Sequence, residues 1–297
     1  MKKIIISQDF EMMWGVHHLY QQKIEESKKF FSEIPKIVES TLTLFKERNL
    51  STTWAVVGAM LMNNWEEYDE KNYYYRYDNK SLNFNQNYKK LDNSGSLFFA
   101  LDLIKKIYFT RGQELGSHSF NHLFFKMPGI SEKNFIEDTN LVLKVFEEKL
   151  SHKPLSYVYP KNETINIDFL KKNGFIKIRE KMTENYYNHH VGSILDYISK
   201  PLRVYDNFNF FKKGSLKTNH NYFFLRFNLT DFFWNVQLDL IKKRILSDDI
   251  RPFHIWWHPR DLIFNSDKNL LRLEHLMDFF KFLIDKKNFT SCNMLNS

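Results

Sequence analysis

The hydrophobic positions alternate between short apolar runs and longer stretches with helical spacing. Ile4 to Ser7 is a compact β-branched run, typical of a strand that is buried on both faces. Ser32 to Asn49 then carries apolar residues at helical intervals, with Pro35 in the first turn, and predicts a helix. Thr52 to Val57 is a second strand, ended by Gly58. This strand–helix–strand order is typical of a parallel sheet.

The same alternation resumes after residue 96. It predicts further strands ending at His118 and over Leu155–Tyr159, Phe175–Ile178, Tyr222–Phe227 and Phe253–Trp257, with helices over Ser131–Leu150, Ile165–Asn173, Trp234–Leu246 and Asn269–Lys286. We find no internal repeat and no linker between these units. About seven β–α units predict an α/β fold, a distorted (β/α)7-type barrel in which residues 1–297 form a single domain. Catalytic residues of such barrels lie at the carboxyl ends of the strands.

Residues 62–96 interrupt this rhythm. The segment mixes polar and aromatic residues without a clean period, as in Asn63-Asn64, Tyr73-Tyr74-Tyr75 and Asn93-Ser94-Gly95. A connection of this length is usually functional or mobile. Two interpretations stay open, a rim over a binding cleft that selects the substrate and an ordered surface insertion.

Composition narrows the class of protein. The net charge is +8, but the basic residues are scattered and form no long block or nucleic-acid-binding signature, so we expect no nucleic-acid partner. The single cysteine, Cys292, excludes a disulfide framework and a cysteine-based zinc site. No apolar stretch is long enough to cross a membrane, and the apolar run at Ile4 is too short for a signal peptide. We expect a cytoplasmic protein, and leave its oligomeric state and any peripheral membrane association open.

Two polar clusters follow predicted strands and suggest a metal site. Asp9-Phe10-Glu11 follows the first strand, and His118-Ser119-Phe120-Asn121-His122 follows a later one. Histidines four residues apart face the same way on a helical turn, and they can bind one ion together. With a carboxylate from elsewhere they form a site that leaves positions free for water and substrate.

A third cluster, His254 to Pro259, also lies at a strand end. Strand alternation places His254, Trp256 and His258 on one face. A histidine there can act as a general acid near neutral pH. We assign this role to His258, which lies nearer the open end, and expect His254 to form a bond within the core.

Together these clusters resemble the motifs of the polysaccharide deacetylases, also called the NodB-homology or carbohydrate esterase family 4 group. The matching segments are Ser7–Glu11, His118–His122, Tyr157–Asn162 and His254–Pro259. The His-Ser-x-x-His segment is the most specific of them. The opening Asp-Phe-Glu-x-x-Trp-Gly, which ends at Trp14 and Gly15, resembles a variant associated with bacterial surface-polysaccharide synthesis.

The resemblance implies a metal-dependent amide hydrolase. Glu11, His118 and His122 would hold a divalent metal, with Zn²⁺ the expected ion, and Asp9 would take a proton from the water that the metal activates. The backbone N–H of Tyr159 would stabilise the oxyanion, and His258 would protonate the departing amine.

The resemblance also implies a substrate, an N-acetyl amino sugar. A cytosolic enzyme would meet it in nucleotide- or lipid-linked form during cell-surface glycan synthesis. We expect Trp14, Asn162, Trp256 and Arg179 to contact that substrate.

The chain departs from the family pattern in three places. Ser156 stands where the third motif usually has an arginine that tunes the base, and Lys161, Arg179 and Arg226 are the candidates to supply that charge. The motif that usually supports the acid histidine cannot be placed. Glu11 replaces an aspartate and has a longer reach.

Two alternative functions share either the proposed ligands or the proposed fold. Two histidines and one carboxylate also form the site of Fe(II) oxygenases, although those usually occupy all-β scaffolds. A catalytically inactive carbohydrate-binding protein would keep the fold without the reaction. The β–α alternation argues against the first, and the complete ligand set with a candidate base argues against the second.

Overall fold

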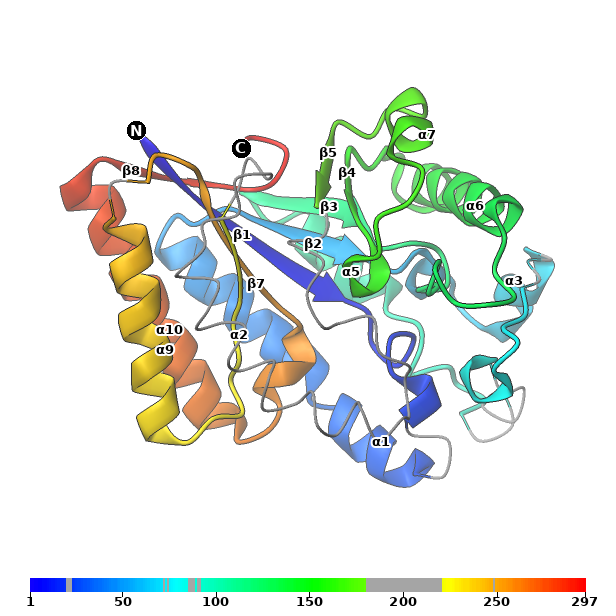
Figure 1. The fold of residues 1–297 in the computed structure, drawn as a ribbon. Coiled ribbons are helices and arrows are strands. Elements are labelled where there is room, and N and C mark those ends of the chain that lie inside the picture. Colours follow the sequence, from blue (N-terminus) through cyan, green and yellow to red (C-terminus); the bar gives the residue numbers. More distant parts are fainter. Residues whose placement is uncertain are drawn as a thin grey trace.

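The computed structural model describes residues 1–19, 23–71, 73, 75–84, 89, 92–179, 221–247 and 249–297. Its centre is a parallel sheet of the strands β1 (Lys2–Phe10), β2 (Thr52–Val56), β3 (Gln113–Ser117), β4 (Ser156–Val158), β5 (Lys177–Arg179), β6 (Asn221–Phe224), β7 (Phe253–Trp257) and β8 (Phe289–Cys292). The order is β5-β4-β3-β2-β1-β7-β6, and β8 pairs with the first half of β1. The sheet curls into a half-barrel with helices around it (Figure 1), so the predicted distorted α/β barrel is confirmed.

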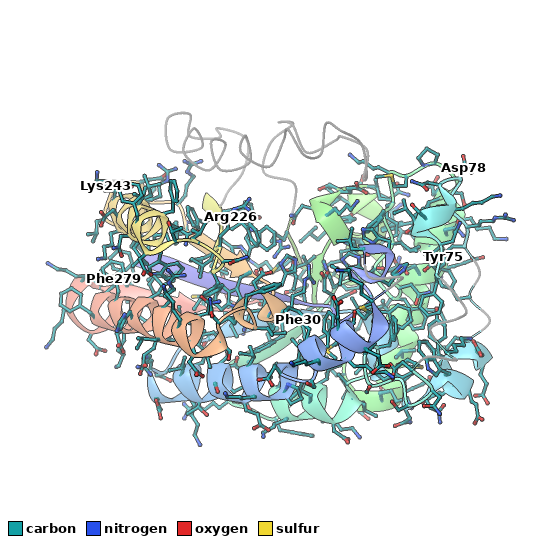
Figure 2. All side chains as sticks on the ribbon, turned by 90° about the horizontal axis from the view of Figure 1, so that it is seen from below. Phe30, Tyr75, Asp78, Arg226, Lys243 and Phe279 are labelled. Carbon is teal, nitrogen blue, oxygen red and sulfur yellow. The ribbon has the colours of Figure 1, made fainter. Side chains whose placement is uncertain are left out.

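The described helices are α1 (Ile24–Phe31), α2 (Ile34–Glu47), α3 (Trp65–Glu70), α5 (Leu101–Tyr108), α6 (Glu132–Leu150), α7 (Ile167–Lys172), α9 (Asp231–Ile245) and α10 (Ser266–Lys287), with short 3-10 turns at His17–Leu19, Gly58–Leu61, Lys80–Leu82, Pro160–Asn162 and Pro259–Leu262. Figure 2 shows α9 and α10 side by side, marked by Lys243 and Phe279, and the ammonium of Lys242 lies 5.8 Å from the Phe279 ring centroid. No described helix is long and apolar enough to cross a membrane.

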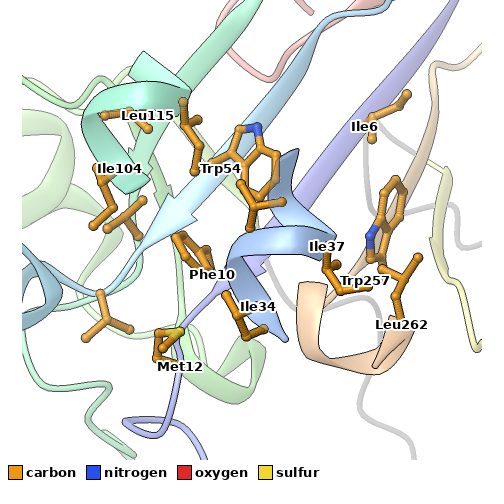
Figure 3. Packing of buried hydrophobic residues seen from close by; sticks show 14 of the residues in the cluster. Ile6, Phe10, Met12, Ile34, Ile37, Trp54, Ile104, Leu115, Trp257 and Leu262 are labelled. Carbon is orange, nitrogen blue, oxygen red and sulfur yellow. The ribbon is translucent and has the colours of Figure 1, made fainter. Parts of the chain in front are cut away.

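Strand alternation separates the two faces of β1. Ile4, Ile6 and Phe10 belong to the large apolar cluster between the sheet and its helices, whereas Ile5 packs in a small interior cluster. Figure 3 shows the outer layer, in which Ile34 and Ile37 of α2 lie beside Phe10. The interior face therefore keeps the polar side chains, including Ser7 and Asp9, inside the curl of the sheet.

The structure differs from the prediction in detail. β1 continues to Phe10, so Asp9 lies within the strand and only Glu11 follows it. Helices α1, α3 and α5 and strand β8 were not predicted. They have at most eight residues each, too few for a clear hydrophobic period to emerge.

Candidate metal and catalytic site

The three expected metal ligands meet at the carboxyl end of the sheet. Glu11 follows β1, and His118 and His122 follow β3. Glu11 Oε2 lies 2.6 Å from His122 Nε2 and 3.3 Å from His118 Nε2. One ligand atom from each residue lies within 4.8 Å of the other two, and all three side chains are buried. This spacing and donor set match what a small divalent cation requires.

The hydrogen bonds around His118 favour a cation at this point. Its Nδ1 lies 2.8 Å from the backbone oxygen of Val158, which can only accept, so Nδ1 carries the proton and Nε2 presents a lone pair. That lone pair faces Glu11 Oε2, a buried oxygen that receives no hydrogen bond. Two acceptors turned toward each other in a buried site are costly without a positive charge between them. The residues therefore fit a metal ion.

The protonation of the two histidines agrees with a ligand role. Burial lowers the pKa of His118 to about 4, although the Asp9 carboxylate opposes the shift. Burial and the neighbouring His118 hold the pKa of His122 well below its ordinary value. Both imidazoles are therefore neutral near pH 7, which is the form that binds a metal.

The backbone between the two histidines is a strained turn, where we expected one turn of helix. Ser119 has a φ of 69° and His122 a φ of 54°. Asp138 of α6 holds the turn, because its buried carboxylate accepts from the backbone N–H groups of Phe120 at 2.8 Å and Asn121 at 3.1 Å. These bonds replace those that a helix would make, and they still bring the two imidazoles to a centroid distance of 4.8 Å. Burial raises the pKa of Asp138 to about 7 despite these donors.

Asp9 is paired with Arg179 in the interior of the sheet. The guanidinium donates to Asp9 Oδ1 at 2.8 Å and to Oδ2 at 2.5 Å, and both side chains are buried. Burial alone would raise the pKa of Asp9, but the charge of Arg179 more than offsets this and lowers the pKa to about 2. Asp9 is therefore ionised at any physiological pH.

This pairing changes the interpretation of Arg179, which we expected to contact substrate. The side chain is 1% exposed; Nη1, which donates to Asp9, also donates to the Ser7 hydroxyl, and Nε donates to the Asn162 side chain. Of the three candidates for the missing arginine of the third motif, Arg179 is the one that reaches Asp9. It comes from β5, which pairs with β4 where Ser156 lies, and its guanidinium occupies the place beside Asp9. Ser156, at the expected position, donates to Glu114 instead.

His258 follows β7, and Asp261 supports it. Its Nδ1 lies 3.0 Å from Asp261 Oδ2, which also accepts from the His258 backbone N–H. Burial alone would lower the pKa of His258, but the Asp261 carboxylate outweighs it and the net direction is upward. We could not place this partner from the sequence, although an acidic residue three positions after a histidine at a turn is a readable capping pattern. His254 is buried, and its Nε2 lies 2.7 Å from the Ser7 hydroxyl, which accepts from Arg179.

Similarity to known proteins is confined to structure. No family model and no curated protein sequence matches the chain. Among solved structures, a protein assigned as a polysaccharide deacetylase from Mycobacterium smegmatis aligns with a TM-score of 0.56 at 13% identity, over 99% of this chain and 87% of that one. The chain has the polysaccharide-deacetylase fold. A protein with the same assignment from Pseudomonas aeruginosa PAO1 gives 0.50 at 12% identity over 98% and 87%, and Puue allantoinase gives 0.56 at 13% over 99% and 87%.

The structure also places the other residues that we expected in the site of this polysaccharide-deacetylase fold. Tyr159 follows β4 and is buried, and the Asn162 side chain accepts from Arg179 at 3.0 Å. Trp256 is partly exposed beneath the Arg179 guanidinium, which lies 4.2 Å from the ring centroid. Trp14 lies elsewhere. It is 1% exposed, donates to the Phe98 carbonyl and packs among aromatic rings, so its place is in the core.

Arg260 is a charged residue of the site that we did not predict. Its guanidinium donates to Glu11 Oε1, the oxygen that lies 3.8 Å from His258 Nε2, whereas His118 and His122 lie nearer Oε2. The side chain is only 19% exposed. No motif pointed to it, since the contact spans 249 positions in the sequence. Arg260 leaves Glu11 Oε2 as the carboxylate oxygen that faces His118 and His122.

The described part of the 62–96 segment packs against the histidine turn. Tyr68 of α3 donates its hydroxyl proton to the Asn121 side chain at 3.1 Å. The Tyr77 hydroxyl accepts from the backbone N–H of Phe124 at 2.9 Å. The segment therefore forms part of the wall behind the candidate ligands.

Proposed function

We propose that the protein is a metal-dependent hydrolase that removes an N-acetyl or similar acyl group from an amino sugar. The observation that carries the proposal is the buried Glu11 Oε2, which faces the His118 lone pair and has no donor. The polysaccharide-deacetylase fold supports the choice of amide hydrolysis. Zn²⁺ is the expected ion, because two imidazoles and one carboxylate are ligands that zinc prefers. When bound, such an ion acidifies water and polarises a carbonyl.

Asp9 is the proposed general base. Arg179 keeps the carboxylate ionised and fixes its orientation through two hydrogen bonds. A carboxylate with a pKa of about 2 takes a proton effectively only from an acidified donor. The role of Asp9 therefore depends on the cation that Glu11, His118 and His122 would hold.

His258 is the proposed general acid. Because Asp261 raises its pKa, a larger fraction of the imidazole is protonated near neutral pH. The departing amine of an amide needs such a proton to leave. The backbone N–H of Tyr159, at the end of β4, would stabilise the negative charge on the carbonyl oxygen. Trp256 and Asn162 would lie along the sugar.

We further propose that the substrate is a nucleotide- or lipid-linked amino sugar used in cell-surface glycan synthesis, and that the enzyme acts in the cytoplasm. The Asp-Phe-Glu-x-x-Trp-Gly segment resembles a variant associated with bacterial surface-polysaccharide synthesis, and this supports the proposed role in glycan synthesis. The net charge of +8 suits an anionic carrier such as a diphosphate.

Acetate release tests the proposal directly. Purified protein loaded with Zn²⁺ is incubated with nucleotide-linked and lipid-linked N-acetyl sugars, with and without chelator. Allantoin is tested in parallel by its disappearance, because its hydrolysis opens a ring and releases no acetate, and an allantoinase shares the fold. We expect acetate from one of the sugars, abolished by chelator and by Asp9→Asn. Activity that requires O₂ and Fe(II) would favour the oxygenase alternative. Sugar binding without acetate release, unchanged by Asp9→Asn, would favour the inactive binding protein.

A further inference from the structure

Gly15 lies against the carboxylate of Glu11. A Cβ atom on residue 15 would stand 2.2 Å from Glu11 Cδ and Oε1 and 2.5 Å from Oε2. Real Cβ contacts essentially never fall below 3.0 Å, so one of the two groups would have to move. The backbone of Gly15 does not lie in the left-handed region. The need for glycine here is therefore one of space.

The backbone of Gly15 cannot easily give way. The Trp14 backbone N–H donates to the Glu11 carbonyl at 3.0 Å and closes a tight turn, and Met13 donates to Leu97 at 3.1 Å. The Trp14 indole is anchored in the core through its 2.8 Å hydrogen bond to Phe98. The buried Trp14 thereby holds residue 15 beneath the carboxylate.

The carboxylate is equally constrained. Arg260 donates to Oε1, and His122 Nε2 lies 2.6 Å from Oε2. Glu11 is only 3% exposed, so its head group has no solvent to move into. A side chain at position 15 would therefore push Oε2 away from the two histidines.

We infer that Gly15 is a positioning residue for the metal ligand Glu11, and that the two residues form one functional pair. The inference rests on the proposed metal site. It also accounts for the glutamate in place of aspartate. The three atoms nearest to the missing Cβ all belong to the carboxyl group, beyond the length that aspartate would retain. The longer side chain reaches the histidines by passing over residue 15, and only glycine leaves that path open.

The pairing of Gly15 with Glu11 is tested by comparing the zinc affinity of four proteins. They are the wild type, Gly15→Ala, Glu11→Asp and the double variant. Affinity is measured by competition with a chromophoric chelator on metal-free protein, and folding is followed by circular dichroism. We expect Gly15→Ala to weaken zinc binding at least about 10-fold, as for other residues that orient ligands. In the Glu11→Asp background the same change should alter affinity less than about 3-fold, since the shorter carboxylate does not cross residue 15.

Gly174→Ala is the matched control. Gly174 has a φ of 94°, so alanine is strained there, yet a Cβ would meet only the flexible end of Lys153. We expect lower stability with unchanged zinc affinity. Equal zinc affinity in wild type and Gly15→Ala, or an equal loss in both backgrounds, would overturn the pairing while leaving the metal site intact. Failure of wild type to bind zinc would instead overturn the metal site itself, and the pairing with it.

If Gly15→Ala does not fold, the folding of the double variant Glu11→Asp/Gly15→Ala tests the inference. A folded double variant supports the pair, because shortening residue 11 has relieved the clash. Failure of both to fold would assign Gly15 a role in the backbone turn alone and overturn the inference.

Discussion

Two buried glutamates, Glu114 within β3 and Glu11 just after β1, have opposite surroundings. Glu114 of β3 is 8% exposed, and protein donors satisfy both of its oxygens: Thr53 at 2.5 Å and the Leu295 backbone N–H at 3.0 Å on Oε2, and Ser156 on Oε1. Glu11 is equally buried, but its Oε2 faces two imidazoles and receives no hydrogen bond. Protein donors thus pair with both oxygens of Glu114, whereas Glu11 receives a donor only on Oε1, from Arg260, and Oε2 is left for the proposed metal ion.

The contrast shows what distinguishes a ligand from a structural acid. Both positions hold a buried glutamate, so neither the residue type nor the burial identifies the candidate metal site. The balance of donors and acceptors differs, and that balance is a property of the three-dimensional arrangement. The following experiments test it, in order of decreasing expected effect.

Removing the cation beside Asp9 should have the largest effect. Arg179→Met leaves a buried carboxylate without a partner, and breaking a buried pair in this way costs about 3–5 kcal/mol. We expect urea unfolding to show a loss of that size. The double variant Asp9→Asn/Arg179→Met should recover much of it. No recovery would mean that Arg179 acts through packing and not through Asp9.

Glu11→Gln should separate binding from stability. An amide keeps the shape but presents a weaker ligand, so we expect zinc affinity to fall at least about 100-fold, equivalent to about 2.7 kcal/mol. The unfolding free energy of the metal-free protein should not fall, because an amide N–H can donate to the His118 lone pair. Chelator competition and urea unfolding measure the two quantities. Clear destabilisation without loss of zinc binding would place Glu11 with the structural acids.

Glu114→Gln should give the reverse pattern. The substitution turns one acceptor into a donor among groups that donate, and we expect a loss of about 1–3 kcal/mol in unfolding free energy. Zinc affinity should stay within about 2-fold of wild type. A loss of zinc affinity as large as that of Glu11→Gln would show that the surroundings of Glu114 and Glu11 are coupled, contrary to our expectation.

Acid unfolding should show the contribution of Asp9. Its pKa falls from 3.8 to about 2 on folding, so the stabilisation is complete above about pH 4 and is lost as pH falls toward 2. At about 1.4 kcal/mol per pKa unit this is about 2.5 kcal/mol. His118 causes a separate loss of stability at higher pH, between its ordinary pKa of 6.5 and its folded pKa of about 4, because burial lowers the folded pKa. In metal-free protein, the stability difference between wild type and Asp9→Asn should therefore shrink only below pH 4.

An exposed pair provides the baseline. Lys281 and Asp285 lie 2.8 Å apart on α10 with side chains 39% and 43% exposed. Water satisfies either partner alone, so Lys281→Ala should change stability by less than about 0.5 kcal/mol. A larger loss of stability in thermal unfolding would mean that an exposed ion pair can matter as much as a buried one, and that exposure does not predict the contribution of a charged residue.

The sequence predicts the ligands better than their supports. Glu11 follows a strand whose apolar run is visible in the sequence, the two histidines carry a recognisable four-residue spacing, and parallel strands end at a common edge. The supporting residues Asp138 and Arg260 reach the site from a helix face and a distant turn. No periodicity encodes such contacts, because any charged residue on those elements looks like a surface residue. The φ values of Ser119 and His122 likewise depend on Asp138, so the local pattern suggested a helical turn.

Trp14 is a residue whose surroundings could not be predicted from the sequence. An aromatic residue near a predicted site suggests a sugar platform, but the stack of rings around it, including Trp65 and Phe98, comes from segments more than 50 positions later. Whether an aromatic ring faces solvent is decided by such distant neighbours.

The pairing of β1 with β7 and β8 has a consequence for synthesis on the ribosome. β1 is made first and lies inside the sheet, yet β7 and β8 on its borders are made more than 240 residues later. The Glu114 carboxylate also waits for the Leu295 N–H. Contacts of such long sequence separation form slowly, and an exposed apolar strand is prone to aggregate in the meantime. Ile4, Ile5 and Ile6 thus lack part of their final strand pairing until β7 and β8 have been made.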